Sequence, residues 1–230
     1  MAENPGRAAS QDDGLAGDAP QVVVQRLPLY ARILAQLASE GAEMVSSEQL
    51  ATQLRMTPAQ IRKDLSYFGR FGKQGRGYNV HRLASELRSI LGLDRVWNAA
   101  LVGVGRLGHA IVNYPGFAPA GFVIVAAFDT DEAIVGTHVG NLMVASLDRI
   151  ATEVPRLDID IGIVAVPDRF AQQVISQLVD AGVKAILNYA PIAPKVPDGV
   201  VVRGVDPVLA LQSMTYYLKA GEESRAGGDS

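Results

Sequence analysis

The sequence contains no cysteine, only three histidines, and no apolar run that approaches the roughly 18–20 residues needed to cross a membrane. The absence of cysteine excludes disulfides, thiol catalysis and thiolate-bound zinc. The N-terminus lacks the basic and then apolar pattern of a signal peptide. None of His81, His109 and His138 ends a predicted strand beside a carboxylate, and no Ser-His-Asp or Tyr-Lys arrangement is visible. These absences predict a soluble, cytoplasmic protein that holds no metal and is not an enzyme.

What the 230-residue chain does have is a high apolar content, 48% of its residues, which is enough for one large domain or two small ones. Between residues 22 and 92, ten basic residues stand against five acidic ones, a net charge of +5. Since the whole chain has a net charge of −3, the rest of the chain has a net charge of −8. This asymmetry predicts two domains with different partners, although basic surface residues can also serve solubility alone.

The N-terminal half has the pattern of a small DNA-binding domain. Helical spacing starts at Leu27, with Pro28 in the first turn, and two further helices are predicted behind capping-box pairs. A glycine-rich segment with two cations follows, which is typical of a hairpin, and a last helix runs into Gly92. This order predicts a winged helix-turn-helix domain over residues 22–92. The capping-box pairs are Ser46 with Gln49 and Thr57 with Gln60.

The third helix of this domain carries the residues expected to reach DNA. Ile61 and Leu65 lie four residues apart and must face the core, so the polar side chains of the same helix face outward toward a major groove. The hairpin is expected at the phosphate backbone or the minor groove. A solvated helix face is the competing interpretation of the cations. The predicted DNA-binding residues are Arg62, Lys63, Ser66 and Tyr67 on the helix, and Lys73, Arg76 and Tyr78 on the hairpin.

In the C-terminal half, over residues 94–205, buried apolar strands alternate with helices. Five strands are predicted, and a helix capped by Asp168 and ended by Gly182 lies between the third and the fourth. Such alternation predicts a Rossmann-like domain with a parallel, doubly wound sheet, and the fold class α/β. The strands are AALVGVG, VIVAAFDTD, DIGIVAVP, KAILNYAP and GVVVRGVD.

A G-x-G-x-x-G segment follows the first of these strands and opens a helix. Gly103 is expected to allow the tight turn, Gly105 to let the backbone approach a pyrophosphate, and Gly108 to allow close helix–strand packing. The helix N-terminus would present free N–H groups to the phosphates, and Arg106 would add a charge-assisted bond. Alone, this motif is weak support, because glycines also occur in ordinary turns.

An acid at the end of the second strand adds the part that the glycines lack. Asp129 and Asp131 lie about 20–25 residues downstream, where a carboxylate accepts hydrogen bonds from the adenosine ribose and repels a 2′-phosphate. We therefore expect NAD(H) and not NADP(H), with Asp129 as the first choice and Asp131 as the alternative. About one domain's worth of chain is available here, which leaves no substrate domain. The cofactor is thus expected to act as a signal.

Together, QIRKDLSYFGRFGKQGRGYNV, VGVGRLGHAIVNYPGF and ILNYAP closely resemble the Rex family of bacterial redox-sensing transcriptional repressors. The resemblance extends from about Leu27 to Lys219. It implies a homodimer that binds palindromic operator DNA when NADH is low and releases it when NADH binds, with NAD⁺ as a weaker ligand. It also implies respiratory and fermentative target genes, and a helix at residues 206–220 that is exchanged with the partner subunit. Residues 1–20 and 221–230 are predicted to be disordered tails.

The resemblance also assigns individual residues. It puts Tyr114, Tyr189 and Pro191 near the nicotinamide, with core packing as the alternative for the tyrosines. It couples Arg32, Tyr114 and Asp206 in a switch, although Pro207 and Val208 stand where relatives often carry bulkier residues. The predicted cofactor-binding residues are Gly103, Val104, Gly105, Arg106, Leu107, Gly108, Asp129, Asp131, Tyr114, Tyr189 and Pro191.

Three other functions stay open from the sequence. An enzyme would transfer hydride, a coenzyme A-binding protein would use the same sheet for a different adenine nucleotide, and a constitutive DNA-binding protein would ignore NADH.

Overall fold

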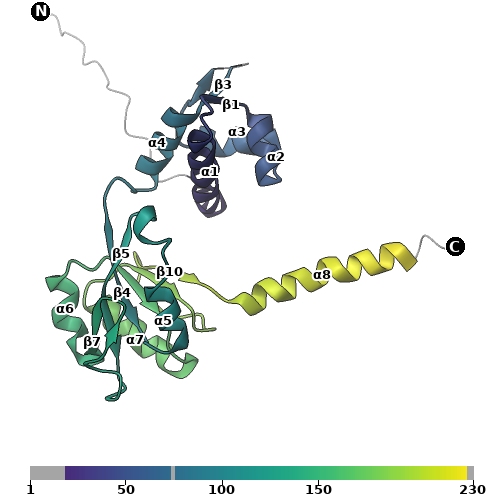
Figure 1. Cartoon of the computed structure of the whole chain (residues 1–230). Helices are drawn as coiled ribbons and strands as arrows, with labels where there is room; N and C mark the ends of the chain where they lie inside the picture. Colours follow the sequence, from purple (N-terminus) through teal and green to yellow (C-terminus); the bar gives the residue numbers. More distant parts are fainter. Residues whose placement is uncertain (1–18, 74–75, 227–230) are drawn as a thin grey trace, which may run out of the picture. The chain divides into compact units, whose positions relative to one another are not determined.

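The computed structural model describes residues 19–73 and 76–226, and the chain divides into two compact units between Arg95 and Val96 (Figure 1). The predicted N-terminal tail lies almost entirely outside the described residues. No helix in the described part of the chain has both the length and the apolar character to span a membrane.

Within its described residues, the first unit contains four helices and a small antiparallel sheet with strand order β1-β3-β2 (Figure 1). β2 and β3 pair as the predicted hairpin, residues 74 and 75 between them lie outside the described residues, and β1 adds a third strand. The unit therefore has the winged helix-turn-helix order. Its elements are α1 (Gln21–Ser39), β1 (Met44–Val45), α2 (Ser47–Leu54), α3 (Pro58–Ser66), β2 (Gly72–Lys73), β3 (Gly77–Asn79) and α4 (Val80–Ile90).

The first helix starts earlier than the sequence predicted. α1 begins at Gln21, six residues before Leu27, so Pro28 lies inside the helix and not in its first turn. A run of β-branched valines followed by an interior proline disfavours a helix locally. Burial outweighs this preference, because Val23 and Leu27, one helical turn apart, both lie in the core.

The starts of the next two helices differ in their capping. At α2, Ser46 and Gln49 form the complete capping box that the sequence predicted. At α3, the Thr57 hydroxyl accepts the Gln60 N–H at 3.2 Å, but the Gln60 side chain donates to Asp64 at 2.6 Å and does not return to the cap. The second predicted box is therefore only half formed, because the Gln60 amide group is oriented toward the buried Asp64 carboxylate and not toward the backbone N–H of Thr57.

The second unit is a seven-stranded sheet with order β10-β9-β8-β4-β5-β7-β6, in which only the edge pair β6–β7 is antiparallel. The fold class is thus the predicted α/β with a Rossmann-like sheet. The short strands β6 and β7 were not predicted. The elements are β4 (Trp97–Val102), α5 (Arg106–Val112), η1 (Ala118–Ala120), β5 (Phe122–Asp129), β6 (His138–Val139), β7 (Leu142–Ser146), η2 (Leu147–Arg149), α6 (Ile150–Arg156), β8 (Ile161–Val164), α7 (Asp168–Asp180), β9 (Ala185–Asn188), β10 (Val201–Gly204) and α8 (Pro207–Ala226).

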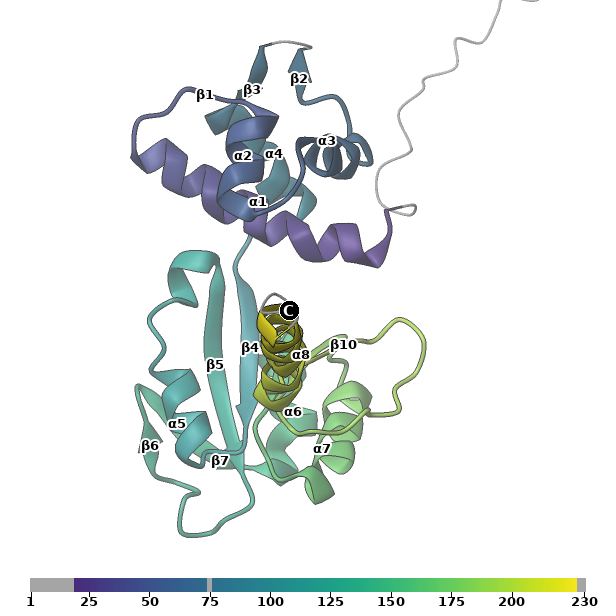
Figure 2. The same cartoon turned by 90° about the vertical axis from the view of Figure 1, so that its right-hand side faces the viewer.

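The two faces of this sheet are covered unequally. α6 and α7 pack on one face through Ile150, Val154, Val174 and other apolar residues, whereas α5 packs on the opposite face (Figure 2). The β9–β10 connection, residues 189–200, contains three prolines and no helix. Part of the α5 face therefore stays open as an apolar groove of about 300 Å³. Its lining residues are Ala99, Phe117, Phe122, Ile124, Ile161, Ile163, Ala185, Ile186, Leu187, Val201 and Arg203.

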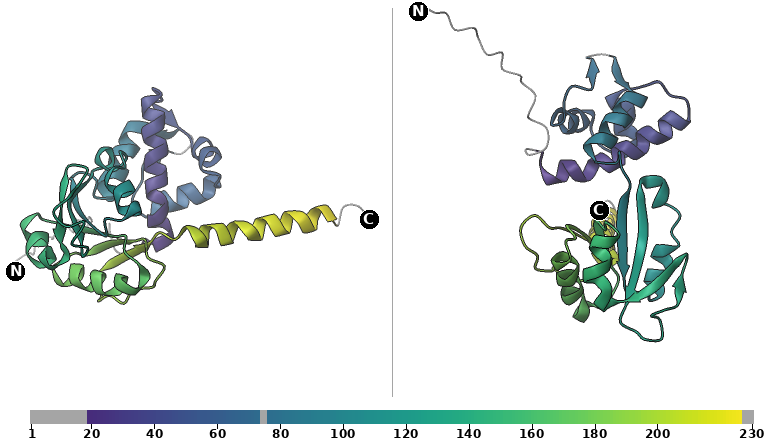
Figure 3. Two further views of the ribbon diagram at one scale, coloured as in Figure 1. Left: turned by 60° about the horizontal axis from the view of Figure 1, so that its bottom comes forward. Right: turned by 90° about the vertical axis from the view of Figure 1, so that its left-hand side faces the viewer.

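Between Pro207 and Lys219, the last helix has no face packed against its own chain. α8 is one uninterrupted helix (Figure 3), and every residue from Pro207 to Lys219 is exposed. It also continues to Ala226, so the tail predicted from residue 221 begins as helix. Helix-favouring glutamates and an arginine follow Gly221 and outweigh that single glycine. Large apolar side chains are found around the whole helix and not along one stripe. They are Val208, Leu209, Leu211, Met214, Tyr216, Tyr217 and Leu218.

Candidate functional site: a DNA-facing cleft and a nucleotide pocket

The inner and outer faces of α3 separate as the sequence predicted. Ile61 and Leu65 are buried in the core of the first unit, and Arg62, Lys63 and Ser66 are exposed on the same helix. Tyr67, at the C-terminal end of α3, is half-buried.

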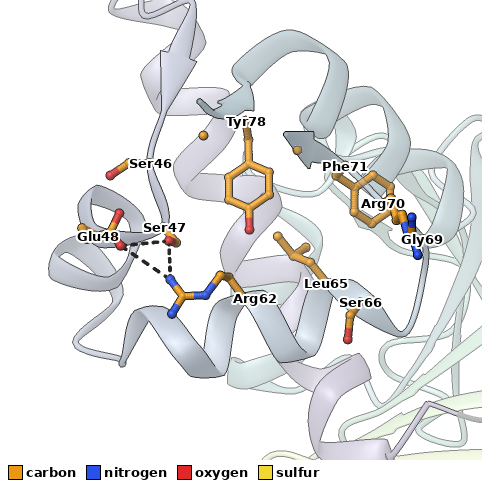
Figure 4. Close-up of a pocket in the computed structure, with 12 residues that line it drawn as sticks. Ser46, Ser47, Glu48, Arg62, Leu65, Ser66, Gly69, Arg70, Phe71 and Tyr78 are labelled. Atoms are coloured by element: carbon orange, nitrogen blue, oxygen red, sulfur yellow. Dashed lines mark hydrogen bonds and ion pairs between the residues drawn. The ribbon is translucent and has the colours of Figure 1, made fainter. Parts of the chain in front are cut away.

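A cleft of about 630 Å³ lies between α3, the start of α2 and the β2–β3 hairpin (Figure 4). Three of the predicted DNA-binding residues, Arg62, Ser66 and Tyr78, line it, and Lys63 and Tyr67 do not. The sequence reasoning missed the other polar side chains of the cleft. Arg70 could have been found as a cation in the glycine-rich stretch, whereas nothing in the local pattern marks Glu48. These missed polar residues are Ser46, Ser47, Glu48 and Arg70.

The hairpin residues are placed less uniformly than predicted. Arg76 is exposed in the turn, and the side chain of Lys73 lies outside the described part of the chain. Tyr78 is only 9% exposed, and burial raises the pKa of its phenol. Its ring forms a wall of the cleft and does not project from the hairpin (Figure 4).

A buried carboxylate attaches α3 to α1. Asp64 is fully buried and accepts two hydrogen bonds from Arg26, Nε at 2.6 Å and Nη2 at 2.7 Å. The Tyr30 hydroxyl donates at 2.5 Å and the Gln60 amide at 2.6 Å. Burial alone would raise the pKa of Asp64, but these bonds outweigh it and lower the pKa below its ordinary value. This network, Arg26–Tyr30–Gln60–Asp64, is called the α1–α3 clamp below.

In the second unit, the three glycines have the geometries that their predicted roles require. Gly103 has φ +96°, and a Cβ there would lie 2.5 Å from the Ala165 carbonyl oxygen. A Cβ on Gly108 would lie 2.1 Å from the Gly103 carbonyl oxygen, which reflects close packing of α5 on the loop. A Cβ on Gly105 would meet nothing within 4 Å, so space is open where a phosphate would approach.

Beside this loop is a pocket of about 480 Å³. It contains four of the predicted cofactor-binding residues, Gly103, Gly105, Asp129 and Asp131. Its apolar walls come from segments that the sequence reasoning did not include, because they follow other strands and join the pocket only through the fold. These walls are formed by Ile134, Leu147, Val166, Pro167, Phe170 and Val174.

Asp129 is fixed by backbone hydrogen bonds. Its Oδ2 accepts the Val104 N–H at 2.7 Å, and its Oδ1 accepts the N–H groups of Thr130 at 2.7 Å and Asp131 at 3.0 Å. With two lone pairs per oxygen, one acceptor position on Oδ2 is left over. The side-chain carboxylate of Asp131 accepts only the Ala133 N–H in the described structure, at 2.9 Å.

The other predicted cofactor residues lie outside this pocket. Tyr114 is 58% exposed, with its ring edge-on to Phe117 at 5.1 Å, whereas Tyr189 is half-buried against the core beneath α5. Pro191 is exposed. Val104, Arg106, Leu107 and Gly108 belong to the glycine loop and the first turn of α5 but do not line the pocket.

The predicted switch residues belong to different units. Arg32 is exposed on α1 of the first unit. Asp206 precedes α8 in the second unit, and its Oδ1 accepts the Val208 N–H at 2.8 Å. Pro207 opens α8, a position that tolerates proline because no helical N–H is lost there.

The first unit is a winged helix with an outward-facing cationic helix. The second is a Rossmann-like unit with a glycine loop and an acid, Asp129, at the end of the second strand. Together they define a ligand-responsive DNA-binding protein. Comparison with known proteins agrees with both halves. Residues 18–66 match a family model described as a putative DNA-binding protein N-terminus, and residues 94–192 match one described as a CoA binding domain.

Curated relatives cover nearly the whole chain. The redox-sensing transcriptional repressor Rex of Roseiflexus sp. (strain RS-1) is 52% identical over 199 residues, 86% of this chain and 90% of its own length. Rex of Chloroflexus aurantiacus (strain ATCC 29366 / DSM 635 / J-10-fl) is 50% identical over 204 residues, which are 89% of this chain and 96% of that relative.

Solved structures of RSP, a Rex-family repressor, also match. RSP with β-NAD⁺ and operator DNA is 37% identical, with a TM-score of 0.85 over 93% of this chain and 99% of that one. RSP with β-NADH is 36% identical, with a TM-score of 0.83 over 91% of this chain and 99% of that one. The chain belongs to the Rex family of redox-sensing transcriptional repressors. Its relatives are named as regulators, which agrees with the prediction that it is not an enzyme.

Proposed function

We propose that this protein is a cytoplasmic, homodimeric repressor that binds palindromic operator DNA. It leaves the DNA when NADH binds, so that respiratory and fermentative genes are expressed. One observation carries the proposal: a single chain joins the cleft beside α3 to the nucleotide pocket at Asp129. RSP, a family relative, has been solved both with operator DNA and with β-NADH.

In this proposal, α3 enters the major groove. Arg62 and Lys63 are exposed on its outer face, and a guanidinium can bind the O6 and N7 atoms of guanine with two hydrogen bonds. Ser66 and Tyr67 follow on the same helix. Lys73, Arg76 and Arg70 come from the adjoining hairpin region, where contacts to phosphate fix the register of the protein on DNA.

The cofactor would bind across the glycine loop. Gly105 gives the pyrophosphate access to the backbone, and the remaining acceptor position of Asp129 suits a ribose hydroxyl. The same carboxylate would repel a 2′-phosphate, which favours NADH over NADPH. The apolar walls at Ile134 and Phe170 suit an adenine ring.

The preference for NADH over NAD⁺ would come from the nicotinamide end. The oxidised ring carries a positive charge, and burying an unpaired charge among apolar groups is costly. The neutral reduced ring enters such surroundings at a smaller cost. Tyr114, Tyr189 and Pro191 are the candidates for these surroundings, and Arg32, Tyr114 and Asp206 for the switch that answers to the cofactor.

The homodimer would be held by exchange of α8. A helix that is apolar all around needs cover on every side, and α8 has none from its own chain between Pro207 and Lys219. The open apolar groove over β8, β9 and β4 is a matching surface in the second unit. We therefore propose that α8 of one subunit is buried by its partner.

Fluorescence anisotropy with a palindromic duplex tests the function directly. The labelled duplex is bound by the protein and titrated with NADH and, separately, with NAD⁺. Release by NADH at concentrations where NAD⁺ has little effect is expected. Tight binding that ignores both nucleotides would contradict the redox response and leave only a DNA-binding protein.

Coenzyme A is the second candidate ligand, because the family model that matches residues 94–192 is described as a CoA binding domain. The acid at Asp129 disfavours the phosphate on the ribose of coenzyme A by charge repulsion. Competition between NADH and coenzyme A distinguishes the two: we expect coenzyme A to leave NADH binding unchanged.

A further inference from the structure

The outward-facing cation Arg62 already has polar partners in the cleft between α3, the start of α2 and the β2–β3 hairpin. Its Nη1 atom donates to the Ser47 hydroxyl at 2.8 Å and lies 3.5 Å from Oε1 of Glu48 (Figure 4). The Ser47 hydroxyl donates in turn to the same Glu48 oxygen at 3.2 Å. Ser47 is buried, whereas the side chains of Arg62 and Glu48 are 55% and 67% exposed. A fixed hydroxyl therefore holds an exposed cation beside an exposed acid.

The charge of Glu48 is unusual for its position. Among the described residues that line the cleft, it is the one acid, and Arg62 and Arg70 are the cations. Hydrogen bonds from its own backbone N–H and from Ser46 lower the pKa of the Glu48 carboxyl, so it is ionised at neutral pH. A negative charge here repels the phosphates of any DNA that enters the cleft.

The physical consequence differs between DNA sequences. On arbitrary DNA, Arg62 would exchange one anionic partner, Glu48, for another, a phosphate, and Glu48 would be left facing DNA. The gain is small because exposed ion pairs are weak and screened by salt. At an operator, Arg62 can gain two directed hydrogen bonds to a guanine, which outweigh the loss of Glu48.

We propose that Glu48 is a specificity-determining residue, which holds Arg62 away from phosphates and so weakens binding to arbitrary DNA more than binding to the operator. This inference rests on the proposed function, since it concerns the same DNA-binding surface. Its basis is the hydrogen-bonded series Glu48–Ser47–Arg62 inside the cleft.

The test compares Glu48→Gln with a matched control, Glu86→Gln. Glu86 is also an exposed acid paired with an arginine, with 3.9 Å between its Oε1 and Nε of Arg82, but it lies on α4 and does not line the cleft. Both variants remove one negative charge from the same unit. Dissociation constants are measured by anisotropy at several salt concentrations. The two duplexes are one selected by the wild-type chain from a randomised pool and a scrambled one of equal length and composition.

Glu48→Gln is expected to bind the scrambled duplex about fivefold more tightly than the wild type does, with less than about a twofold gain for the selected duplex. The slope of log K against log salt for scrambled DNA should steepen by about one, because Arg62 becomes free to contact phosphate. Glu86→Gln should change both duplexes by less than about twofold. Thermal unfolding confirms that both variants fold.

Two results would overturn the inference. Equal changes for Glu48→Gln and Glu86→Gln would reduce the effect to general charge. Weaker binding of the selected duplex by Glu48→Gln would mean that Glu48 itself supports the DNA contact. If the wild-type chain enriches no duplex from the pool, the proposed function itself is contradicted. This result differs from the two above, which overturn only the role of Glu48.

Discussion

Gly105 and Gly108 belong to one motif but make different demands on the fold. A methyl group at Gly105 meets nothing in the protein, and its φ of −75° suits alanine. We therefore expect Gly105→Ala to unfold at the wild-type temperature and to lose at least about tenfold in NADH affinity, because the methyl group would occupy the space proposed for the pyrophosphate.

Gly108→Ala is the matched variant with the opposite expected outcome. Its methyl group would lie 2.1 Å from a backbone oxygen, which cannot move aside as a flexible side chain can. Overpacking of this kind costs about 1–3 kcal/mol, so the second unit should melt several degrees lower. Calorimetry and NADH titration of the two variants check both statements. Equal melting temperatures would contradict the assigned role of Gly108.

At Asp129 the carboxylate has two tasks, because it accepts three backbone N–H groups in addition to its proposed ribose contact. Asp129→Ala should leave DNA binding intact while blunting release by NADH, measured by anisotropy. Asp129→Asn keeps one acceptor oxygen and the side-chain size, so it separates loss of the ribose contact from loss of loop geometry. If Asp131→Ala blunts release and Asp129→Asn does not, the ribose assignment moves to Asp131.

On the scale of elements, the α1–α3 clamp predicts how the first unit responds to acid. Since the folded pKa of Asp64 lies below its ordinary value, its ionisation contributes stability that is complete above an ordinary aspartate pKa of about 3.9. That contribution is lost as the pH falls through the lower, folded value. Denaturant unfolding followed from pH 7 downward should therefore show a steep decline only below about pH 4.

Asp64→Asn removes the charge but keeps the shape of the side chain. It leaves the Arg26 cation without its partner, and breaking a buried pair in this way costs about 3 kcal/mol. The variant should be less stable at pH 7 and show a flatter acid dependence. Unchanged stability at neutral pH would contradict the clamp as a stabilising contact between α1 and α3.

The same clamp illustrates what the sequence could and could not predict. The capping box at Ser46, the outward face of α3 and the turn at Gly103 depend on neighbours within a few residues, and the structure agrees with each. Arg26 and Asp64 are 38 residues apart, and no local pattern pairs them. Glu48 likewise meets Arg62 only because α2 and α3 pack together. The early start of α1 and the strands β6 and β7 were missed because tertiary burial, not local preference, decides them.

On the scale of the whole molecule, the exposed apolar surface of α8 predicts the oligomeric state. Leu211 and Leu218 lie seven residues apart on one side of the helix, and both are at least 60% exposed in the single chain. Replacing both by aspartate should prevent their burial by a partner and yield a monomer with weak operator binding. Light scattering coupled to size exclusion gives the mass.

Ser213→Asp adds a charge to a polar position of the same helix and should remain dimeric if the apolar residues are what matters. A dimer that survives the double substitution at Leu211 and Leu218 would contradict the exchange of α8.

The helix-free β9–β10 connection has a consequence for how the protein is made. The groove that it leaves open is complete once β10 has been synthesised, whereas α8 is synthesised only after β10. Under the proposed exchange, the apolar groove and α8 of each new chain stay exposed to water until a second chain binds. Assembly then becomes a step of biogenesis that depends on how many copies are being translated nearby. Subunits of a mature pair would trade partners slowly, because each exchange requires a whole helix to be withdrawn into water.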